Sequence, residues 1–323
     1  TNSSNDSLTT RTKKSFAKWR TLVGLSDLEA AEKIHSDSIH ILFDLSGHTA
    51  FNRLAVFAYR PAPIQVTWLG YWASTGIPEI NYILGDRFIT PYEDQLRYVE
   101  TIAHMPNSYL CYTSPEFNIE TVPPPALVNG YVTFGCFNKI ERLNDDVLST
   151  WSKILASVPN SKLHLKDRYL LDHSMASKIH NKFESLGIDK ARVILEGSSA
   201  RIDYFRSYNN IDITLSPFPY GGGTTSADSL WMGVPVLVKG GDSLLSRIGE
   251  SITYNCGLKE WVGFDEKDYI KKAIDFAYDL DRLIFLRERL RNDLLKSPLM
   301  DAERFAFDFS NVIQSFWEKY VNK

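Results

Sequence analysis

A glycine-rich segment in the second half of the chain has the residue types to bind an anion. It reads Pro217-Phe218-Pro219-Tyr220-Gly221-Gly222-Gly223-Thr224-Thr225-Ser226-Ala227-Asp228 and lies between a predicted strand and a predicted helix. The glycines let a ligand approach the backbone, and the unpaired N–H groups that begin a helix favour a pyrophosphate. A plain glycine turn, with Thr225 and Asp228 forming a capping box, fits the same residues, so both interpretations stay open. No lysine follows the glycines and the Gly-x-Gly-x-x-Gly spacing is absent, which argues against a P-loop or a dinucleotide fingerprint.

A second candidate follows the strand predicted at 131–137. It reads Phe137-Asn138-Lys139-Ile140-Glu141-Arg142. Because the carboxyl ends of parallel strands share one edge of a sheet, we expect this segment to face the glycine loop. The guanidinium of Arg142 could grip phosphate oxygens and neutralise a leaving diphosphate. Taken alone, Lys139 and Arg142 are more typical of solvated surface charges.

A third candidate, Asp44-Leu45-Ser46-Gly47-His48-Thr49, ends the strand predicted at 39–45. A histidine at a strand end is well placed for acid–base or hydrogen-bonding work. A satisfied structural histidine is the more common reading of His48 alone. No metal site is predicted, since the single Asp-x-Asp, at 279–281, falls in a helical pattern typical of a solvated face.

The composition bounds what these candidates can belong to. The chain has 323 residues, 44% of them hydrophobic and 23% charged, which predicts about two domains with buried cores. A net charge of −3 without a basic block argues against nucleic acid as a partner. No apolar run approaches the roughly 20 residues that span a bilayer. The 3 cysteines form no pair motif, which favours a reducing cytoplasm over a disulfide framework.

The elements that must position these residues alternate between strands and helices. Short apolar runs predict strands, among them 64–69, which ends near a glycine, and 211–215 in the second half. A capping box at Ser26 starts one helix, and Asn144 can cap another. Strand–helix alternation after residue 130 predicts a doubly wound α/β domain with its ligand at the carboxyl ends of the strands. A proline-rich stretch at 115–129 is the predicted linker. Residues 301–320 predict a capped amphipathic helix.

Several ordered motifs together resemble those of the O-GlcNAc transferase/SPINDLY family of glycosyltransferases. In the first half they are Arg60-Pro61-Ala62-Pro63-Ile64-Gln65-Val66-Thr67-Trp68-Leu69-Gly70-Tyr71, Thr75-Gly76 and Asp86. In the second half they are Val158-Pro159-Asn160-Ser161, Gly222-Gly223-Thr224-Thr225 with Asp228, Leu230-Trp231-Met232-Gly233-Val234-Pro235 and Ser297-Pro298-Leu299. The match runs from about Ile34 to the C-terminus.

The resemblance implies an α/β fold of the GT-B type, with two Rossmann-like lobes and a C-terminal helix that packs back on the first. Residues 1–114 would be the N-terminal, acceptor-side lobe and 115–129 the linker. Residues 130–300 would be the nucleotide-sugar-binding lobe and 301–323 the crossing helix. The family's first strand and histidine-bearing loop, and its tetratricopeptide repeats, have no counterpart here, which makes the first lobe incomplete and the chain either a fragment or a reduced member.

The resemblance also implies the site residues. The donor-binding residues would be Asn138, Arg142, Gly222, Gly223, Thr224, Thr225 and Asp228. The threonines would contact the diphosphate and the acid the ribose, Arg142 would neutralise the leaving diphosphate, and Gly76 would lie on the sugar and acceptor side. Together with Arg142, His48 is a predicted catalytic residue, because of its position at a strand end rather than because of the resemblance. Two departures stand out: Arg142 replaces the usual lysine, and Tyr204 replaces a histidine that points into the site.

We therefore expect an inverting, metal-independent glycosyltransferase without a cofactor. Its partners would be a UDP-sugar, UDP-GlcNAc first, and a serine or threonine hydroxyl of a protein or peptide, with no nucleic acid and no membrane. GDP-fucose or UDP-glucose stays open as the donor. A nucleotide-sugar-binding module without transferase activity is the main alternative, and an epimerase or phosphorylase shares only the fold.

Overall fold

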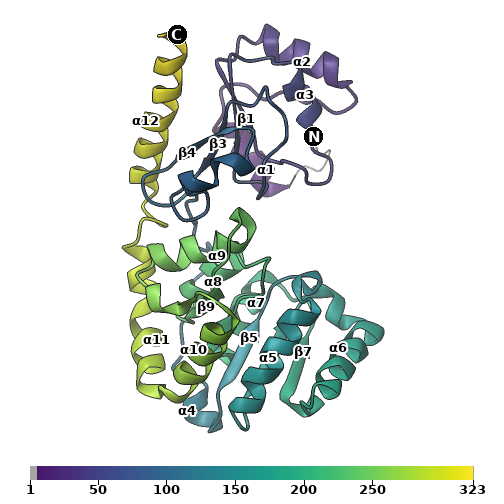
Figure 1. The fold of residues 1–323 in the computed structure, drawn as a ribbon, viewed down its shortest axis with the longest axis vertical. Helices are drawn as coiled ribbons and strands as arrows, with labels where there is room; N and C mark the ends of the chain where they lie inside the picture. The colour runs from purple at the N-terminus through teal and green to yellow at the C-terminus, as the bar shows by residue number, and fades with distance from the viewer. Residues whose placement is uncertain (1–5, 323) are drawn as a thin grey trace. The chain divides into compact units, whose positions relative to one another are not determined.

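The computed structural model describes residues 6–322, and the contacts along the chain divide it into two units (Figure 1). Unit 1 comprises the described residues through Tyr109 together with those from Phe307 onward. Unit 2 comprises Leu110–Ala306. The predicted bounds place the end of the first lobe at residue 114 and the start of the final segment at 301, so the contact boundaries lie close to both.

Unit 1 holds a four-stranded parallel sheet in the order β1-β2-β3-β4. Its elements are α1 (Ser7–Lys14), α2 (Asp27–Ser36), β1 (Ile41–Asp44), α3 (Leu54–Ala58), β2 (Ile64–Trp68), β3 (Tyr82–Gly85), η1 (Tyr92–Arg97) and β4 (Thr101–His104). Strand β2 is buried on both faces, as expected for a parallel sheet, and even Gln65 is 0% exposed. Its amide nitrogen donates to the carbonyls of Phe57 and Glu79, whereas its buried Oε1 has no hydrogen-bond partner.

The last helix, α12 (Ala302–Val321), packs on unit 1 from Phe307 onward. Phe316 stacks on Tyr82 with ring centroids 4.0 Å apart. Phe309 lies 5.0 Å from the ring of Trp68. These aromatic contacts cover part of the apolar stripe that the sequence predicts, since Phe316 is buried and Phe309 half-buried, whereas Tyr320 is exposed. The expected return of the C-terminal helix to the first lobe is confirmed.

Unit 2 holds a six-stranded parallel sheet in the order β10-β9-β8-β5-β6-β7. Its strands are β5 (Thr133–Cys136), β6 (Lys162–Lys166), β7 (Val193–Glu196), β8 (Ile213–Leu215), β9 (Val236–Lys239) and β10 (Val262–Gly263). Read from β7, the order is that of a dinucleotide-binding fold, with the chain reversing direction across the sheet between β5 and β8. Ligands of such sheets bind at the carboxyl ends of the strands, at this switch point.

Helices cover both faces of the unit 2 sheet (Figure 1). They are α4 (Ala126–Asn129), α5 (Asp145–Ser157), α6 (His173–Ser185), α7 (Arg201–Ser207), α8 (Thr224–Trp231), α9 (Leu244–Asn255), α10 (Glu266–Tyr278) and α11 (Leu280–Leu295), with short turns η2 (Ile140–Arg142), η3 (Arg168–Leu171), η4 (Lys190–Arg192), η5 (Tyr208–Asn210) and η6 (Lys259–Trp261). Helices α5, α6 and α10 lie side by side on one face. There Trp151 and Tyr269, both 0% exposed, anchor the core. Tyr269 also donates to the carbonyl of Ser216, which ties the core to the loop after β8.

The local predictions have mixed outcomes. The capping box at Ser26 and the cap of α5 by Asn144 are confirmed. The capping box of Thr225 and Asp228 is wrong, because Gly223 precedes the first turn of α8 and no side chain caps it. Strands β4 and β10 were not predicted, because β4 mixes polar with apolar residues and β10 has only two residues.

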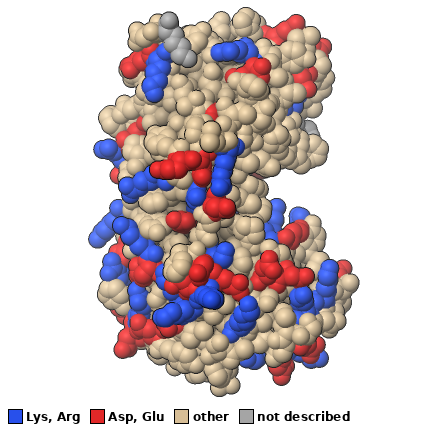
Figure 2. Space-filling model, viewed as in Figure 1, with Lys and Arg blue, Asp and Glu red and all other residues tan. Residues whose placement is uncertain are grey.

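On the face of the molecule in view, acidic and basic residues are interspersed, and no large patch carries a single sign of charge (Figure 2). Within residues 6–322, no helix is both long enough and apolar enough to cross a membrane.

Candidate functional site

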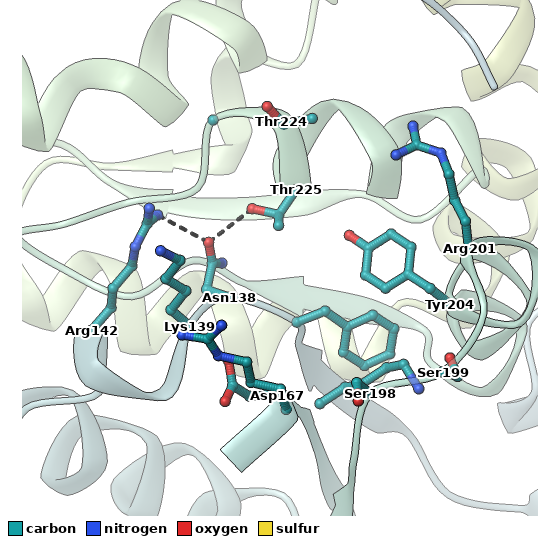
Figure 3. Close-up of a pocket in the computed structure, with 14 residues that line it drawn as sticks. Asn138, Lys139, Arg142, Asp167, Ser198, Ser199, Arg201, Tyr204, Thr224 and Thr225 are labelled. Carbon is teal, nitrogen blue, oxygen red and sulfur yellow. Dashed lines mark hydrogen bonds between the residues drawn. The ribbon is translucent and has the colours of Figure 1, made fainter. Parts of the chain in front are cut away.

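A pocket of about 480 Å³ opens in unit 2 where β5 and β6 end and α8 begins (Figure 3). Its lining residues are Phe137, Asn138, Lys139, Arg142, Lys166, Asp167, Arg168, Ser198, Ser199, Arg201, Tyr204, Gly223, Thr224 and Thr225. This is the edge of the sheet at which the switch point lies. Two lysines and three arginines face a single carboxylate, Asp167, so the pocket is suited to an anion.

Asn138 joins the two segments that the sequence analysis placed at this edge (Figure 3). Its side-chain oxygen accepts a hydrogen bond from the Thr225 hydroxyl at 2.8 Å. The same oxygen accepts a second from the Arg142 guanidinium at 3.2 Å. Asn138 is 5% exposed, so this amide is a fixed hub between the end of β5 and the start of α8.

Arg142 is pinned against the glycine loop. One guanidinium nitrogen donates to the carbonyl of Gly221 at 2.7 Å, and the guanidinium carbon lies 3.6 Å from the centroid of the Tyr220 ring. Its buried Nε has no hydrogen-bond partner. Burial lowers the pKa of Arg142. A desolvated guanidinium with an unused donor gains free energy when an anion binds beside it.

The glycine loop begins α8 without a side-chain cap. Gly222 donates its N–H to the Ser216 hydroxyl at 3.1 Å, and its carbonyl accepts from Ser226 at 2.9 Å. A Cβ atom on Gly222 would lie only 2.6 Å from the Thr225 hydroxyl, so glycine is required at this position. Thr224 is exposed to the pocket, and the first N–H groups of α8 have no intrahelical acceptors.

Asp228 does not line the pocket. It is 5% exposed, and its two oxygens accept from the hydroxyls of Tyr112 at 2.6 Å and Tyr204 at 3.1 Å. Tyr204 in turn bonds Tyr208 at 2.9 Å, whose hydroxyl donates to the carbonyl of Thr225 at 3.2 Å. Burial raises the pKa of Asp228. The residue therefore reaches the pocket through the Tyr204 side chain, and a direct ribose contact stays a prediction.

An ion pair that no sequence motif predicted joins a buried lysine of the pocket to a partly exposed glutamate. Lys166, at the end of β6, is 4% exposed and pairs with Glu196. The ammonium also donates to the carbonyl of Gly197 at 3.1 Å. His164 lies on the same face of β6, 2.8 Å from the other Glu196 oxygen, and burial lowers its pKa. The alternation Lys162-Leu163-His164-Leu165-Lys166 was the signal that places these polar residues on one face.

Unit 1 carries the other predicted site residues at the carboxyl end of its own sheet. His48 follows β1, and its Nε2 lies 2.9 Å from the carbonyl oxygen of Thr75. Gly76 follows at a φ of 71°, the left-handed region that favours glycine. Gly47 has a φ of 50°, and a Cβ there would lie 2.1 Å from Cβ of Tyr71. The backbone of the loop after β1 therefore packs directly against the Tyr71 side chain in the loop after β2.

Asp44, at the end of β1, holds the loop that carries His48. Its carboxylate accepts from the N–H groups of Ser46 at 3.1 Å and Gly47 at 2.8 Å, and from the Thr67 hydroxyl at 3.0 Å. Among residues 6–322, no three His, Cys, Asp or Glu side chains are grouped so that they could hold a metal ion.

Comparison with known proteins decides the family. The model of glycosyl transferase family 41 matches residues 2–115 and 120–309. The chain belongs to this family.

Two relatives extend this result. The probable UDP-N-acetylglucosamine–peptide N-acetylglucosaminyltransferase SPINDLY of Solanum lycopersicum is 38% identical over 306 residues, covering 94% of this chain and 33% of that protein. The family 41 chain thus spans about one third of the length of this relative. A mutant of the Thermobaculum terrenum O-GlcNAc transferase is 34% identical, with a TM-score of 0.93 over 98% of this chain and 60% of that one.

The fold has a wider distribution than the family. Anabaena HepE, solved with UDP and glucose, matches with a TM-score of 0.60 at 10% identity over 96% of this chain and 90% of that one, which shows a shared fold alone. The predicted fold class, α/β of the GT-B type with two Rossmann-like lobes and a C-terminal helix on the first, is confirmed.

Proposed function

We propose that this family 41 chain transfers a sugar from a nucleoside diphosphate donor to a serine or threonine hydroxyl of a protein. The observation that carries the proposal is the Asn138 hub, which fixes a partly desolvated Arg142 beside the first turn of α8 in a pocket with five cations. UDP-GlcNAc is the first candidate donor, supported by the names of the tomato and Thermobaculum relatives.

Each pocket residue has a role in this proposal. The diphosphate binds between Arg142 and the first turn of α8, with hydrogen bonds from Thr224, Thr225 and the N–H groups after Gly222 and Gly223. As the bond between the sugar C1 and the diphosphate breaks, negative charge grows on the diphosphate. Preorganised donors stabilise that charge more in the transition state than in the ground state.

The remaining roles concern the acceptor. Direct attack of the hydroxyl on C1, opposite the leaving diphosphate, inverts the configuration. Gly76 would lie on the sugar side, and the imidazole of His48 would take the acceptor proton. A nucleic acid or membrane has no part in this reaction. A cytoplasmic location is in keeping with Cys111, Cys136 and Cys256, all of which are free thiols.

The experiment that tests the proposal compares transfer with binding. Radiolabelled UDP-GlcNAc, UDP-glucose and GDP-fucose are incubated with the chain and a mixture of unfolded proteins, and label incorporated into protein is measured. Calorimetric titration with each nucleoside diphosphate runs in parallel. Binding together with label transfer supports the proposal, and binding without transfer favours the alternative of a nucleotide-sugar-binding module. Absence of both contradicts the site assignment.

Metal independence is a separate expectation. Since Arg142 and the start of α8 would carry the charge of the leaving diphosphate, excess EDTA should change the transfer rate by no more than about twofold. Activity that returns only when manganese or magnesium is added would contradict this part of the proposal.

A further inference from the structure

Glu100 is a buried carboxylate in unit 1 that no motif of the sequence singles out. It is 0% exposed and lies directly before β4. Its carboxylate accepts from the Ser74 hydroxyl at 2.8 Å, from the Thr75 N–H at 2.7 Å and from the Thr75 hydroxyl. All three donors belong to one turn, and no cation within the described residues pairs with Glu100. The hydrogen bonds that this carboxylate accepts therefore fix the position of Thr75.

The Thr75 carbonyl in turn fixes the imidazole of His48. A carbonyl oxygen only accepts hydrogen bonds, so the Nε2 atom that lies 2.9 Å from it must carry a proton. In the neutral ring this leaves Nδ1 as the nitrogen with a free lone pair. His48 is exposed, and no group within the described residues is hydrogen-bonded to Nδ1. The ring of Tyr71, 5.3 Å away at 68°, holds the imidazole from the side.

We propose that Glu100 is a positioning residue that acts through Thr75 to hold His48 in the Nε2-protonated tautomer, with Nδ1 as the proton acceptor. The inference rests on the proposed function for its chemistry, but not for its geometry. The acceptor oxygen forms a bond to the sugar C1 as the bond from C1 to the diphosphate oxygen breaks. The hydroxyl proton passes to Nδ1, which gives an imidazolium and a free nucleoside diphosphate, and the imidazolium then loses its proton to water.

The first test measures the tautomer itself. The chain is labelled with ¹⁵N at its 7 histidines, and long-range ¹H–¹⁵N spectra are recorded along a pH series into the neutral plateau. The signals of His48 are assigned by their loss in His48→Gln. We expect a pyridine-type Nδ1 and a pyrrole-type Nε2, because the two nitrogen types differ strongly in chemical shift. The opposite assignment in the unsubstituted chain overturns the proposal without any variant.

The second test removes the carboxylate. In Glu100→Ala the Thr75 turn loses its anchor, and the His48 signals should move toward a mixture of tautomers. Asp86→Ala is the matched control. Asp86 is also 0% exposed in unit 1, but its carboxylate accepts from the N–H groups of Phe88, Ile89 and Tyr109 instead. An unchanged tautomer in Glu100→Ala, or an equal change in Asp86→Ala, overturns the proposal.

Turnover separates positioning from general stability. Glu100→Ala should lower kcat about tenfold with the donor KM unchanged, because general-base catalysis depends on the orientation of the base. Glu100→Gln keeps an oxygen that can accept from Thr75, so it should restore kcat and keep the tautomer. A rise in KM together with a fall in kcat, neither of which Glu100→Gln restores, contradicts the role. If the spectra meet every expectation but the unsubstituted chain transfers no sugar, the proposed function is wrong and the tautomer control stands.

Discussion

The carboxyl ends of the two sheets differ in the charges that they offer. In unit 2, Lys139, Arg142, Lys166, Arg168 and Arg201 line the pocket with one carboxylate. In unit 1, the segments that follow β1 and β2, residues 45–53 and 69–81, contain one basic residue, Arg53, which is paired with Asp27. An anionic donor is therefore expected in unit 2, whereas the unit 1 loops are suited to a neutral hydroxyl.

The two units also use their buried carboxylates differently. Asp44 and Glu100 in unit 1 accept mainly from backbone N–H groups and hydroxyls of the loops that carry His48 and Thr75. Asp228 in unit 2 accepts from two tyrosine hydroxyls instead, one of which, Tyr204, lines the pocket. The acids thus shape both regions without facing a ligand themselves. In the proposed reaction, cations and N–H groups of unit 2 therefore bind the diphosphate, and His48 of unit 1 accepts the proton of the acceptor hydroxyl.

The largest expected effect tests the charge of unit 2. Arg142→Ala removes a guanidinium whose contact strengthens as the diphosphate leaves, so the barrier to transfer should rise by about 3 kcal/mol. Arg142→Lys should recover much of the loss if an ammonium reaches the same oxygens. Rates of label transfer at saturating donor measure both. Lys139→Ala is the control, because Lys139 also lines the pocket but is exposed. An equal loss in Lys139→Ala would mean that only net charge matters.

The next effect tests the role of Asp228. Asp228→Ala leaves the buried hydroxyl of Tyr112 and the half-buried hydroxyl of Tyr204 without their carboxylate acceptor, which should lower the free energy of unfolding by about 2 kcal/mol. Binding of UDP should weaken as well, because Tyr204 loses its anchor. Tyr112→Phe separates the two effects, since Tyr112 bonds Asp228 but does not line the pocket. Denaturant titration and calorimetry measure them. If Tyr204→Phe, which removes the hydroxyl that Asp228 anchors, leaves affinity intact while Asp228→Ala abolishes it, Asp228 contacts the donor directly.

A smaller effect tests the glycine loop. In Gly222→Ala the new Cβ would displace the Thr225 hydroxyl from Asn138, and we expect about tenfold weaker UDP binding, or 1.4 kcal/mol. Gly187→Ala is the control in the same unit, because its φ of 82° makes alanine unfavourable while nothing lies within 4 Å of the new Cβ. It should lower stability and leave UDP affinity unchanged. Equal affinities of the two variants would show that the loop tolerates the Cβ atom.

The sequence predicted the parts of this comparison that depend on local pattern. Apolar runs predicted strands β2 and β8, and capping residues predicted where helices α2 and α5 begin. The meeting of Asn138 with the glycine loop followed from a rule of parallel sheets, that strand ends share an edge.

The rest depends on contacts between residues far apart in the chain. Tyr112 and Asp228 are 116 positions apart, and nothing in either neighbourhood marks the hydrogen bond between them. Glu100 lies in a mixed polar stretch, where a buried acid has the same local pattern as an exposed one. The capping box at Thr225, one of the two interpretations left open, is wrong for the same reason, because Thr225 donates its hydroxyl hydrogen to Asn138, 87 positions away.

The smallest effect compares how pH acts on the acids of the two units. Hydrogen bonding and charge from Arg20 lower the pKa of Asp37 in unit 1 from 3.8 to about 2, whereas burial raises the pKa of Asp228 in unit 2 above 3.8. A lowered pKa contributes stability that is present above 3.8 and is lost as the pH falls toward 2. A raised pKa contributes stability that is present below 3.8 and is lost as the pH rises through the folded-state value.

The two acids should therefore act in separate pH windows. Relative to the unsubstituted chain, Asp37→Asn should lose stability as the pH rises from about 2 to about 4 and then stay constant. Asp228→Asn should instead gain relative stability above about pH 4, because the unsubstituted chain must then ionise a buried carboxyl. Urea midpoints of the three proteins across this range measure both trends. If both variants instead lose relative stability between about pH 2 and pH 4, burial does not raise the pKa of Asp228. Its hydrogen bonds from the tyrosines would then outweigh its desolvation.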